Sequence, residues 1–309
     1  MTSVTEWRAA GSFFEHRGHR IFWREANNSG APTLLLIHGF PTASWDWEKI
    51  WPDLVARYHV LTLDMIGFGF SDKPYAYDYR IMDQADICDE FLRMRGVKEY
   101  HLFSHDYGDT VACELIARDL EDVQRPKLLS VGFLNGGLFP ETHHRTFSQS
   151  LLLSPIGPLV ALMTSKERMT KSMREVFGKY LPPDEETIDS IWALIKNNHG
   201  ERIMHKLIHY IPERIEYRER WVGGMQKTTV PLKLIDGRVD PISGAHMAAH
   251  YRELIPNANV TELAEVGHYP QVQAPKQVLD AYLGFRDEIA RSPSPSRDPT
   301  QGVQSWNSE

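Results

Sequence analysis

The chain has 309 residues, of which 42% are hydrophobic and 24% are charged, and its formal net charge is −7 at pH 7. This length and composition predict a globular protein with a large core, arranged as one domain with an insertion or as two domains. The acidic balance offers no basic face for nucleic acid, and no run of about 18 apolar residues occurs that could span a membrane, so we expect neither nucleic acid nor a membrane as a partner.

The two cysteines and the first residues of the chain bear on the cellular compartment. Cys88 and Cys113 both lie in apolar, helix-like surroundings, which is typical of buried thiols in a reducing compartment rather than of a disulfide framework. Residues 1–11 are polar and lack the apolar core of a signal peptide. We therefore expect a cytoplasmic protein, and the sequence leaves open whether it is a monomer or a homodimer.

The first 138 residues alternate between predicted strands and helices. Arg17-Gly18 is a turn signal between two strand-like segments, at 12–16 and 20–24. Residues 33–37 form a continuous apolar run, as expected for a strand that is covered on both faces. The elements that follow in chain order are a helix at 44–57, a strand at 60–63, a helix at 80–95, a strand at 100–103, a helix at 108–118 and a strand at 128–134. This alternation predicts a parallel sheet with helices on both faces.

The alternation stops at about residue 138 and resumes later in the chain. Residues 139–221 have a mostly helical pattern, so we expect an all-helical cap inserted into a core made of residues 1–138 and 222–291. The core then continues with a strand at 230–235, a helix at 245–254, a strand at 260–263 and a helix at 276–290. Residues 292–309 are rich in serine and proline and are expected to be disordered.

Asp106 stands between a predicted strand and a predicted helix, in Ser104-His105-Asp106-Tyr107-Gly108. This layout is typical of a nucleophile elbow with the pattern G-x-S-x-G, except that aspartate replaces the serine. A carboxylate is ionised at neutral pH and needs no base to attack. Its attack on an ester carbonyl would give a reactive anhydride, whereas attack on a saturated carbon gives an ordinary ester. An epoxide or an alkyl halide is therefore the natural substrate, and a simple helix N-cap is the alternative interpretation of Asp106.

Three further groups are needed to hydrolyse an ester on Asp106. The first is a base, for which His268, just after the last predicted strand, is the candidate. The second is a carboxylate that orients the histidine; Asp240 is preferred, and Asp236, at the strand end itself, is the rival. The order nucleophile, acid, base is that of the α/β-hydrolase triad. Each residue could instead be an ordinary loop residue, but their joint occurrence at predicted strand ends favours a catalytic site.

The third requirement is a pair of backbone N–H donors for the oxyanion that forms during hydrolysis. Phe40, in His38-Gly39-Phe40-Pro41, and Tyr107, directly after the nucleophile, are the candidates. Glycine lets the backbone approach the reacting group closely, and proline stiffens the turn. An ordinary turn at the end of a strand is the alternative interpretation of this tetrapeptide.

Over residues 12–290, the sequence resembles the α/β-hydrolase superfamily, in its Asp-nucleophile branch of epoxide hydrolases and haloalkane dehalogenases. Within that branch it is similar to the bacterial relatives of the mesoderm-specific transcript protein. The segments that carry the resemblance are residues 38–41, 67–74, 104–109, 135–143 and 220–223. The resemblance implies the α/β-hydrolase fold, with a central sheet flanked by helices, a helical cap, and Asp106, Asp240 and His268 as the catalytic triad.

Within this branch, the two chemistries use different helper groups. The resemblance implies that a dehalogenase would hold the halide with side-chain N–H donors, but the corresponding positions carry Tyr107 and Phe40, which have none. An epoxide hydrolase would instead use cap tyrosines that donate to the epoxide oxygen. Tyr210 has the spacing from Asp240 that the family implies for the second cap tyrosine, with lid packing as its alternative role.

The early cap tyrosine of the family is missing from residues 148–155. His143 and Tyr180 are the candidates to replace it. The cap residues expected to contact the substrate are His143, Tyr180 and Trp192.

The sequence thus predicts an epoxide hydrolase acting on a small hydrophobic substrate. Asp106 would form a hydroxyalkyl ester with Tyr210 assisting, and water activated by His268 would release the diol, with no metal or organic cofactor. The alternatives are a haloalkane dehalogenase and a non-catalytic protein of the same fold that only binds a ligand.

Overall fold

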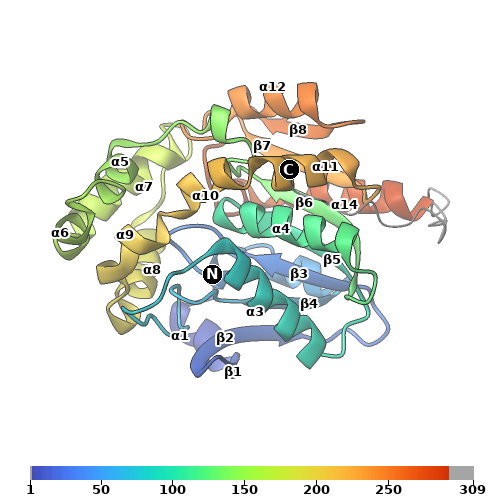
Figure 1. The fold of residues 1–309 in the computed structure, drawn as a ribbon, viewed down its shortest axis with the longest axis horizontal. Coiled ribbons are helices and arrows are strands. Elements are labelled where there is room, and N and C mark those ends of the chain that lie inside the picture. Colours follow the sequence, from blue (N-terminus) through green and yellow to red (C-terminus); the bar gives the residue numbers. More distant parts are fainter. Residues whose placement is uncertain (1, 292–309) are drawn as a thin grey trace, which may run out of the picture.

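An eight-stranded sheet forms the centre of the structure, a computed structural model that describes residues 2–291 (Figure 1). The strands lie in the order β1-β2-β4-β3-β5-β6-β7-β8, with bounds Ser12–His16, His19–Ala26, His59–Leu63, Thr33–Ile37, Glu99–His105, Lys127–Leu134, Leu232–Gly237 and Asn259–Leu263. β2 pairs antiparallel with β1 and β4, and the other neighbouring strands are parallel. The predicted hairpin and sheet are confirmed, and the tail predicted to be disordered, 292–309, lies outside the described residues.

Alternate side chains of the central strand β3 enter two separate apolar layers. Leu35 and Ile37 pack with the helices α3 (Ile81–Met94), α4 (Tyr107–Glu121) and α12 (Ala245–Leu254). Leu34 and Leu36 pack on the opposite face with α1 (Val4–Ala9), α2 (Trp51–Val55) and α14 (Pro275–Arg291). Because successive side chains of a strand point to opposite faces, this arrangement explains why the strand is apolar at every position.

Two elements near the N-terminus differ from the sequence prediction. The expected helix that starts at Ser44 is two separate elements, the 3₁₀ helix η1 (Ser44–Trp47) and α2. Pro52 is the reason, because proline fits the first turn of a helix but cannot donate the hydrogen bond that an interior position needs. The helix α1 was not predicted. A capping box between Ser3 and Glu6 starts it, and its buried Trp7 holds it on the core.

Between β6 and β7 the chain forms only helices and loops, as predicted. These helices are η2 (Pro140–Thr142), α5 (Phe147–Leu152), α6 (Gly157–Leu162), α7 (Lys166–Phe177), α8 (Glu185–Lys196), η3 (Asn197–Ile203), α9 (Met204–Leu207), α10 (Tyr210–Glu216) and α11 (Arg218–Lys227). Figure 1 shows α5 to α9 gathered at one end of the molecule, whereas α11 packs along α4 of the core. The predicted boundary between residues 221 and 222 therefore falls inside α11.

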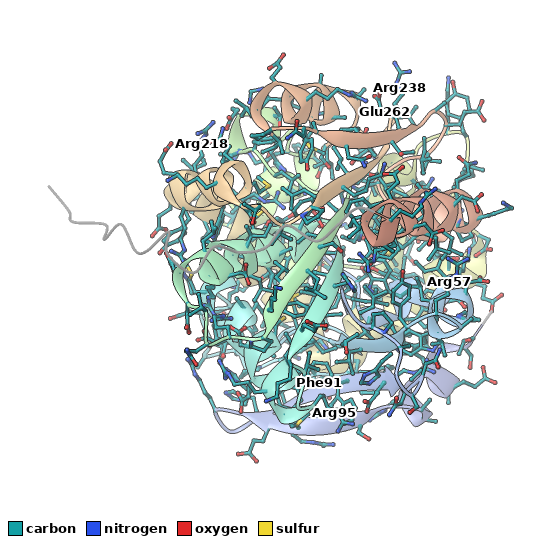
Figure 2. All side chains as sticks on the ribbon, turned by 90° about the vertical axis from the view of Figure 1, so that its right-hand side faces the viewer. Arg57, Phe91, Arg95, Arg218, Arg238 and Glu262 are labelled. Atoms are coloured by element: carbon teal, nitrogen blue, oxygen red, sulfur yellow. The ribbon has the colours of Figure 1, made fainter. Side chains whose placement is uncertain are left out.

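Charged side chains lie at the edge of the sheet. Arg238 and Glu262, at the outer edge of the sheet in Figure 2, lie 3.8 Å apart, and charges on an edge strand discourage pairing with other strands.

Cys88 and Cys113 are buried, free thiols, as predicted. Within residues 2–291, no helix combines the length and the apolar character needed to cross a lipid bilayer.

A buried carboxylate ties α11 to the core. Glu114 on α4 accepts hydrogen bonds from Arg118 Nε at 2.7 Å, Arg220 Nε at 2.7 Å and Trp221 Nε1 at 2.9 Å. Burial by itself would raise the pKa of Glu114, but these donors outweigh it and keep the pKa below its ordinary value. The ionised carboxylate thus joins the last helix of the insertion to the helix that starts at Tyr107.

We expect Glu114→Gln to lower the free energy of unfolding by about 3 kcal/mol, because Arg220 would lose its buried anionic partner and Arg118 would lose one of its two. Urea denaturation followed by far-UV circular dichroism measures this change. Glu121 also pairs with Arg220 but is much more exposed, so Glu121→Gln should cost less than about 1 kcal/mol. Equal losses in the two variants would contradict the assignment of Glu114 as the buried clamp.

Candidate active site

Asp106 lies at the turn between β5 and α4 with a strained backbone, at φ 47° and ψ −103°. Such a conformation costs about 1–3 kcal/mol for a non-glycine residue and is typical of functional sites. Two small residues make the turn possible. A Cβ on Gly108 would come within 2.6 Å of the Ile37 carbonyl oxygen, and Ser104, in the place of the usual glycine, donates its hydroxyl to Asp109 Oδ1 at 2.6 Å.

The Asp106 side chain does not serve as a helix cap. Asp106 occupies the N-cap position of α4, but its side chain makes no capping hydrogen bond. Instead, Asp106 Oδ2 accepts the backbone N–H of Phe40 at 3.1 Å. Gly39 permits this approach, because a Cβ at that position would meet the Asp106 Cβ at 3.0 Å and the His105 ring at 2.6 Å. The loop after β3 thus holds one carboxylate oxygen and leaves the other available.

The ends of β5, β7 and β8 bring the three predicted triad residues together. His268 Nδ1 and Asp240 Oδ2 are 2.8 Å apart, and His268 Nε2 is 3.8 Å from Asp106 Oδ2. All three side chains are almost fully buried. Because the carboxyl ends of parallel strands meet at one edge of the sheet, residues 106, 240 and 268 become neighbours despite their separation in sequence.

Asp240, rather than Asp236, is the partner of His268. Asp240 Oδ2 also accepts hydrogen bonds from Asn135 Nδ2 at 3.0 Å and from the Ser243 hydroxyl at 2.8 Å. Burial would raise the pKa of Asp240, but His268, the Ile242 N–H and the Asn135 amide keep it below its ordinary value. Asp236 has the opposite environment, since burial, followed by the charge of Asp240, raises its pKa to about 8. Asp236 is therefore mostly protonated at neutral pH, and only Asp240 is a charged partner for the histidine.

The charges in the site keep Asp106 ionised and His268 protonated. Burial would raise the pKa of Asp106, but the interaction with His268 and the charge of Arg214 hold it well below its ordinary value. Burial would likewise lower the pKa of His268, but Asp240 and Asp106 outweigh this effect and raise it to about 10. The free site therefore contains an ionised carboxylate next to an imidazolium.

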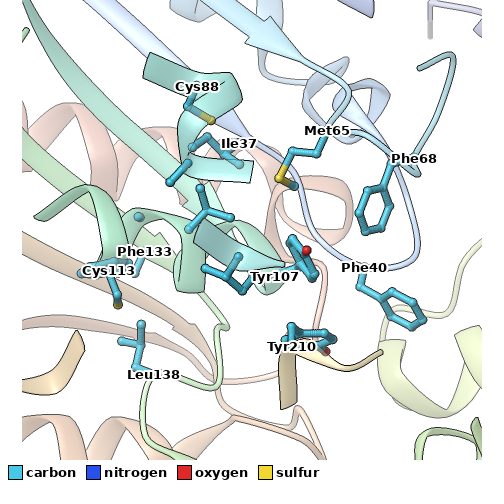
Figure 3. Packing of buried hydrophobic residues seen from close by; sticks show 14 of the residues in the cluster. Ile37, Phe40, Met65, Phe68, Cys88, Tyr107, Cys113, Phe133, Leu138 and Tyr210 are labelled. Atoms are coloured by element: carbon cyan, nitrogen blue, oxygen red, sulfur yellow. The ribbon is translucent and has the colours of Figure 1, made fainter. Parts of the chain in front are cut away.

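Tyr210, at the start of α10, lies among residues that contact or adjoin Asp106. Its side chain is fully buried, and its ring centroid is 4.9 Å from that of Tyr107 and 6.0 Å from that of Phe40, as Figure 3 illustrates. The Tyr210 hydroxyl has no hydrogen-bond partner among the described residues. An unpaired buried polar group costs about 1–3 kcal/mol, so such a group needs an explanation, and a ligand that accepts its hydrogen bond is one.

Tyr107 has a buried side chain that packs between Phe68 and Tyr210, and its hydroxyl donates to the Tyr79 carbonyl at 3.4 Å. Its backbone N–H is the first of α4 and therefore lies next to Asp106. The role of the Tyr107 N–H as the second oxyanion donor stays a prediction. The Phe40 N–H makes the expected contact with the carboxylate.

Arg214 is a site residue that the sequence analysis missed. Its guanidinium is buried, with Nη2 3.2 Å from the Asp106 carbonyl oxygen, to which it donates, and 3.7 Å from Asp106 Oδ1. Its Nε donates to the Thr110 hydroxyl at 2.8 Å, and it stacks on the Tyr210 ring at 4.5 Å. The sequence feature that could have identified Arg214 is its spacing from Tyr210, because positions i and i+4 share one face of a helix.

Of the three other cap residues predicted to contact substrate, only His143 lies beside these groups. Arg214 Nη1 lies 3.1 Å from His143 Nδ1, and because arginine can only donate, Nδ1 accepts and Nε2 carries the proton. Burial, and then the charge of Arg214, lower the pKa of His143 to about 3. His143 Nε2–H is thus a second buried donor with no partner among the described residues.

Tyr180 and Trp192 occupy other parts of the cap. Tyr180 is exposed, with Lys179 over its ring, and Trp192 is half-buried, with Lys196 over its ring. Within the described chain, neither makes a hydrogen bond or a ring contact with the triad or with Tyr210. Sequence reasoning could not separate them from His143, because position within a helical insertion does not reveal which helix faces the sheet.

Comparison with known proteins shows the family to which the chain belongs. The sequence model of the alpha/beta hydrolase fold family matches residues 32–275. The chain belongs to this family. This α/β-hydrolase is 39% identical to the mesoderm-specific transcript protein of Mus musculus, over 92% of the chain and 88% of that protein. It is 34% identical to LipZ of Mycobacterium tuberculosis, over 92% of the chain and 98% of LipZ.

Among solved structures, this α/β-hydrolase is similar to a loop variant of the haloalkane dehalogenase DbeA from Bradyrhizobium elkanii. The TM-score is 0.75 at 23% sequence identity, with 91% of this chain and 97% of that chain covered. At this identity the likeness concerns the fold. The fold prediction and the resemblance to the mesoderm-specific transcript protein are therefore confirmed, whereas the Asp-nucleophile branch remains to be argued from the site.

Asp106→Asn should lower the pKa of His268 by removing one of the two negative charges that keep it protonated. NMR titration of the ring nitrogens in ¹⁵N-histidine-labelled protein measures this directly. The His268 signal of the unaltered protein should stay in the imidazolium form to about pH 10, and that of the variant should titrate at lower pH.

Asp236→Asn is the matched control for this titration. Asp236 is mostly uncharged at pH 7, so its replacement should leave the His268 signal in the imidazolium form at neutral pH, with any difference confined to the range above about pH 8, where Asp236 itself ionises. An unaltered His268 pKa in Asp106→Asn would show that the carboxylate of Asp106 does not act on the imidazole.

Proposed function

We propose that this protein is an epoxide hydrolase that opens an epoxide to a diol through a covalent ester on Asp106. The observation that carries the proposal is an ionised, buried carboxylate that lies beside a His–Asp pair and beside Arg214, whose guanidinium stacks on the unpaired buried phenol of Tyr210. Apolar and aromatic side chains such as Phe40 and Phe68 surround these groups, which suits a small hydrophobic substrate. A cytoplasmic location and a monomeric or homodimeric state are part of the same proposal.

In the first step, Asp106 attacks one carbon of the epoxide ring. Oδ2 is engaged by the Phe40 N–H, so Oδ1 is the oxygen that forms the new bond to carbon. The ring C–O bond breaks, and its electron pair goes to the epoxide oxygen. The Tyr210 hydroxyl gives that oxygen a proton, and the guanidinium of Arg214, near Oδ1, stabilises the developing negative charge.

In the second step, the ester itself prepares His268 to act as a base. Alkylation of Asp106 removes one of the carboxylate charges that hold the histidine protonated, so the pKa of His268 falls and its proton passes to the Tyr210 phenolate left by the first step. The neutral imidazole then takes a proton from water, which attacks Asp106 Cγ. The oxyanion forms on Oδ2, where the Phe40 N–H already lies.

Collapse of this intermediate returns the site to its starting state. The Cγ–Oδ1 bond breaks, and the diol leaves with Oδ1 and the proton held by His268. The proton remaining on the new carboxyl group passes to His268, which becomes an imidazolium again. The sum is one epoxide and one water converted to one diol, with Asp106 again ionised.

A haloalkane dehalogenase is the second candidate, and Arg214 is the observation that favours it. A buried guanidinium beside Asp106, together with the unpaired His143 Nε2–H, could hold a leaving halide as well as an alkoxide. The two reactions differ in one respect, since an alkoxide must receive a proton and a halide need not. The unpaired hydroxyl of Tyr210 therefore supports the epoxide assignment.

The covalent ester can be trapped by removing the base. His268→Gln should retain the first step and lose the second, so incubation with styrene oxide should increase the intact mass by one substrate, with the added mass on the peptide that contains Asp106. Intact-protein and peptide mass spectrometry measure both. Parallel incubation with a bromoalkane tests the dehalogenase candidate.

The double variant Asp106→Asn/His268→Gln is the control and should gain no mass. Adduct formation from the bromoalkane alone would select the dehalogenase. If a panel of epoxides and haloalkanes leaves His268→Gln unmodified, the protein of this fold only binds a ligand, and the enzymatic proposal is wrong.

Tyr210→Phe should slow epoxide opening by about 10² or more, because it removes the proton donor and leaves the ring in place. Halide release from any haloalkane substrate should change much less, since no proton is required. Steady-state rates of diol and halide formation give the comparison. Tyr251, whose buried hydroxyl is also unpaired but lies on α12, supplies the control: Tyr251→Phe should leave both rates unchanged.

A further inference from the structure

Exposed apolar side chains gather at the tip of the cap. Within residues 2–291, twelve large hydrophobic side chains are exposed, and five of them lie in the seventeen-residue segment 147–163. These five, each more than half exposed, are Phe147, Ile156, Leu159, Leu162 and Met163. Figure 1 shows α6, which carries Leu159 and Leu162 and is flanked by Ile156 and Met163, at the end of the molecule's long axis, away from the sheet. We call this segment the apolar tip. Contiguous exposed apolar surface of this kind marks interaction sites.

The helix α6 is built with its small residues inside and its large ones outside. The positions that it buries are Gly157 and Ala161. A Cβ on Gly157 would meet the Leu152 carbonyl oxygen at 2.1 Å, so the inner face fits closely against α5. Leu159 and Leu162 point to the outside. A helix that served only to cover the sheet would bury its leucines, so the outer face has another use.

Positive charges outnumber negative ones in the sequence that contains and flanks the apolar tip. Residues 144–174 contain five lysines and arginines but a single acidic residue, Glu167, in a chain whose net charge is −7. Lys166 and Arg174 pair with acidic residues of α8, whereas Arg145 and Lys171 are exposed and have no acidic partner within the described chain. Leucine, isoleucine and phenylalanine flanked by cations form the pattern of a surface that lies in a lipid headgroup region.

We propose that the apolar tip, residues 147–163, docks on an anionic membrane surface with its cations against the headgroups. The tip projects from the molecule and its apolar residues are mainly aliphatic, which suits insertion among acyl chains better than a protein partner's pocket. The short helices α5 and α6 would lie in the plane of the interface, so this mode of binding needs no membrane-spanning helix. The docking does not depend on which reaction Asp106 carries out.

A single helix connects the apolar tip with the triad. α7 begins at Lys166, beside the tip, and ends near the loop of His268. The Val176 carbonyl accepts the backbone N–H of His268 at 3.0 Å, and the Phe177 ring stacks on Tyr269 at 4.9 Å. If the proposed function also holds, a lipophilic substrate dissolved in the bilayer would meet the cap at the end that is mechanically tied to the catalytic histidine.

Vesicle flotation of the full chain tests the docking. The protein should float with vesicles of equal parts phosphatidylcholine and phosphatidylserine, bind phosphatidylcholine vesicles more weakly, and detach from the mixed vesicles at high salt. Leu159→Gln/Leu162→Gln should reduce partitioning by about tenfold or more, because the variant buries less apolar area at the interface. Lys171→Glu should weaken binding to the anionic vesicles in particular.

Leu120→Gln/Val123→Gln removes comparable exposed apolar surface away from the tip and should bind like the unaltered protein. Thermal unfolding of each variant establishes that it is folded. Absence of flotation by the unaltered protein, or equal losses in the two double variants, would overturn the proposal. Because flotation needs no turnover, this result is separate from the outcome of the adduct experiment.

Discussion

The site depends on keeping the carboxylate of Asp106 charged where water is nearly excluded. Taking a carboxylate out of water costs several kcal/mol unless opposite charges and hydrogen bonds compensate. Here the imidazolium of His268, the guanidinium of Arg214 and the N–H of Phe40 all face this one side chain. Each of them comes from a different part of the chain, so the charged nucleophile exists only when sheet, loop and cap are assembled.

In the proposed reaction, the same balance of charges would give the histidine two roles in turn. With Asp106 ionised, His268 is an imidazolium that stabilises the carboxylate. If Asp106 carried an ester, only Asp240 would remain to hold the proton, and the imidazole would become a base. Asp236 would not disturb this change, because its burial keeps it mostly neutral at pH 7. The proposed chemistry would thus switch the protonation state of the site.

The cap combines three structural tasks in one helical insertion. α10 supplies Tyr210 and Arg214 above the carboxylate, α11 anchors the insertion to the core through Glu114, and the segment 147–163 presents apolar side chains outward. The anchored end and the projecting end lie on opposite sides of α10. This division explains why the insertion buries its site so completely while leaving large aliphatic side chains exposed elsewhere.

The sequence by itself determined most of the fold and the identity of the triad candidates. Apolar runs such as residues 33–37 define strands without reference to the rest of the chain, and the elbow pattern around Asp106 is local. Pairing Asp106 with Asp240 and His268 needed only the rule that parallel strands end at one edge. Pro52 divides a predicted helix in two, and the reason is also local, because proline lacks the backbone N–H that an interior helical position donates.

Only the tertiary structure decided which cap residues face Asp106. His143, Tyr180 and Trp192 were equivalent in sequence, yet Arg214 contacts only the first of them, and Arg214 itself was not foreseen. The helices of the insertion carry apolar residues on more than one face, so their pattern cannot say which face meets the sheet. That choice is made by packing between segments far apart in the chain, and packing is a property that no local pattern records.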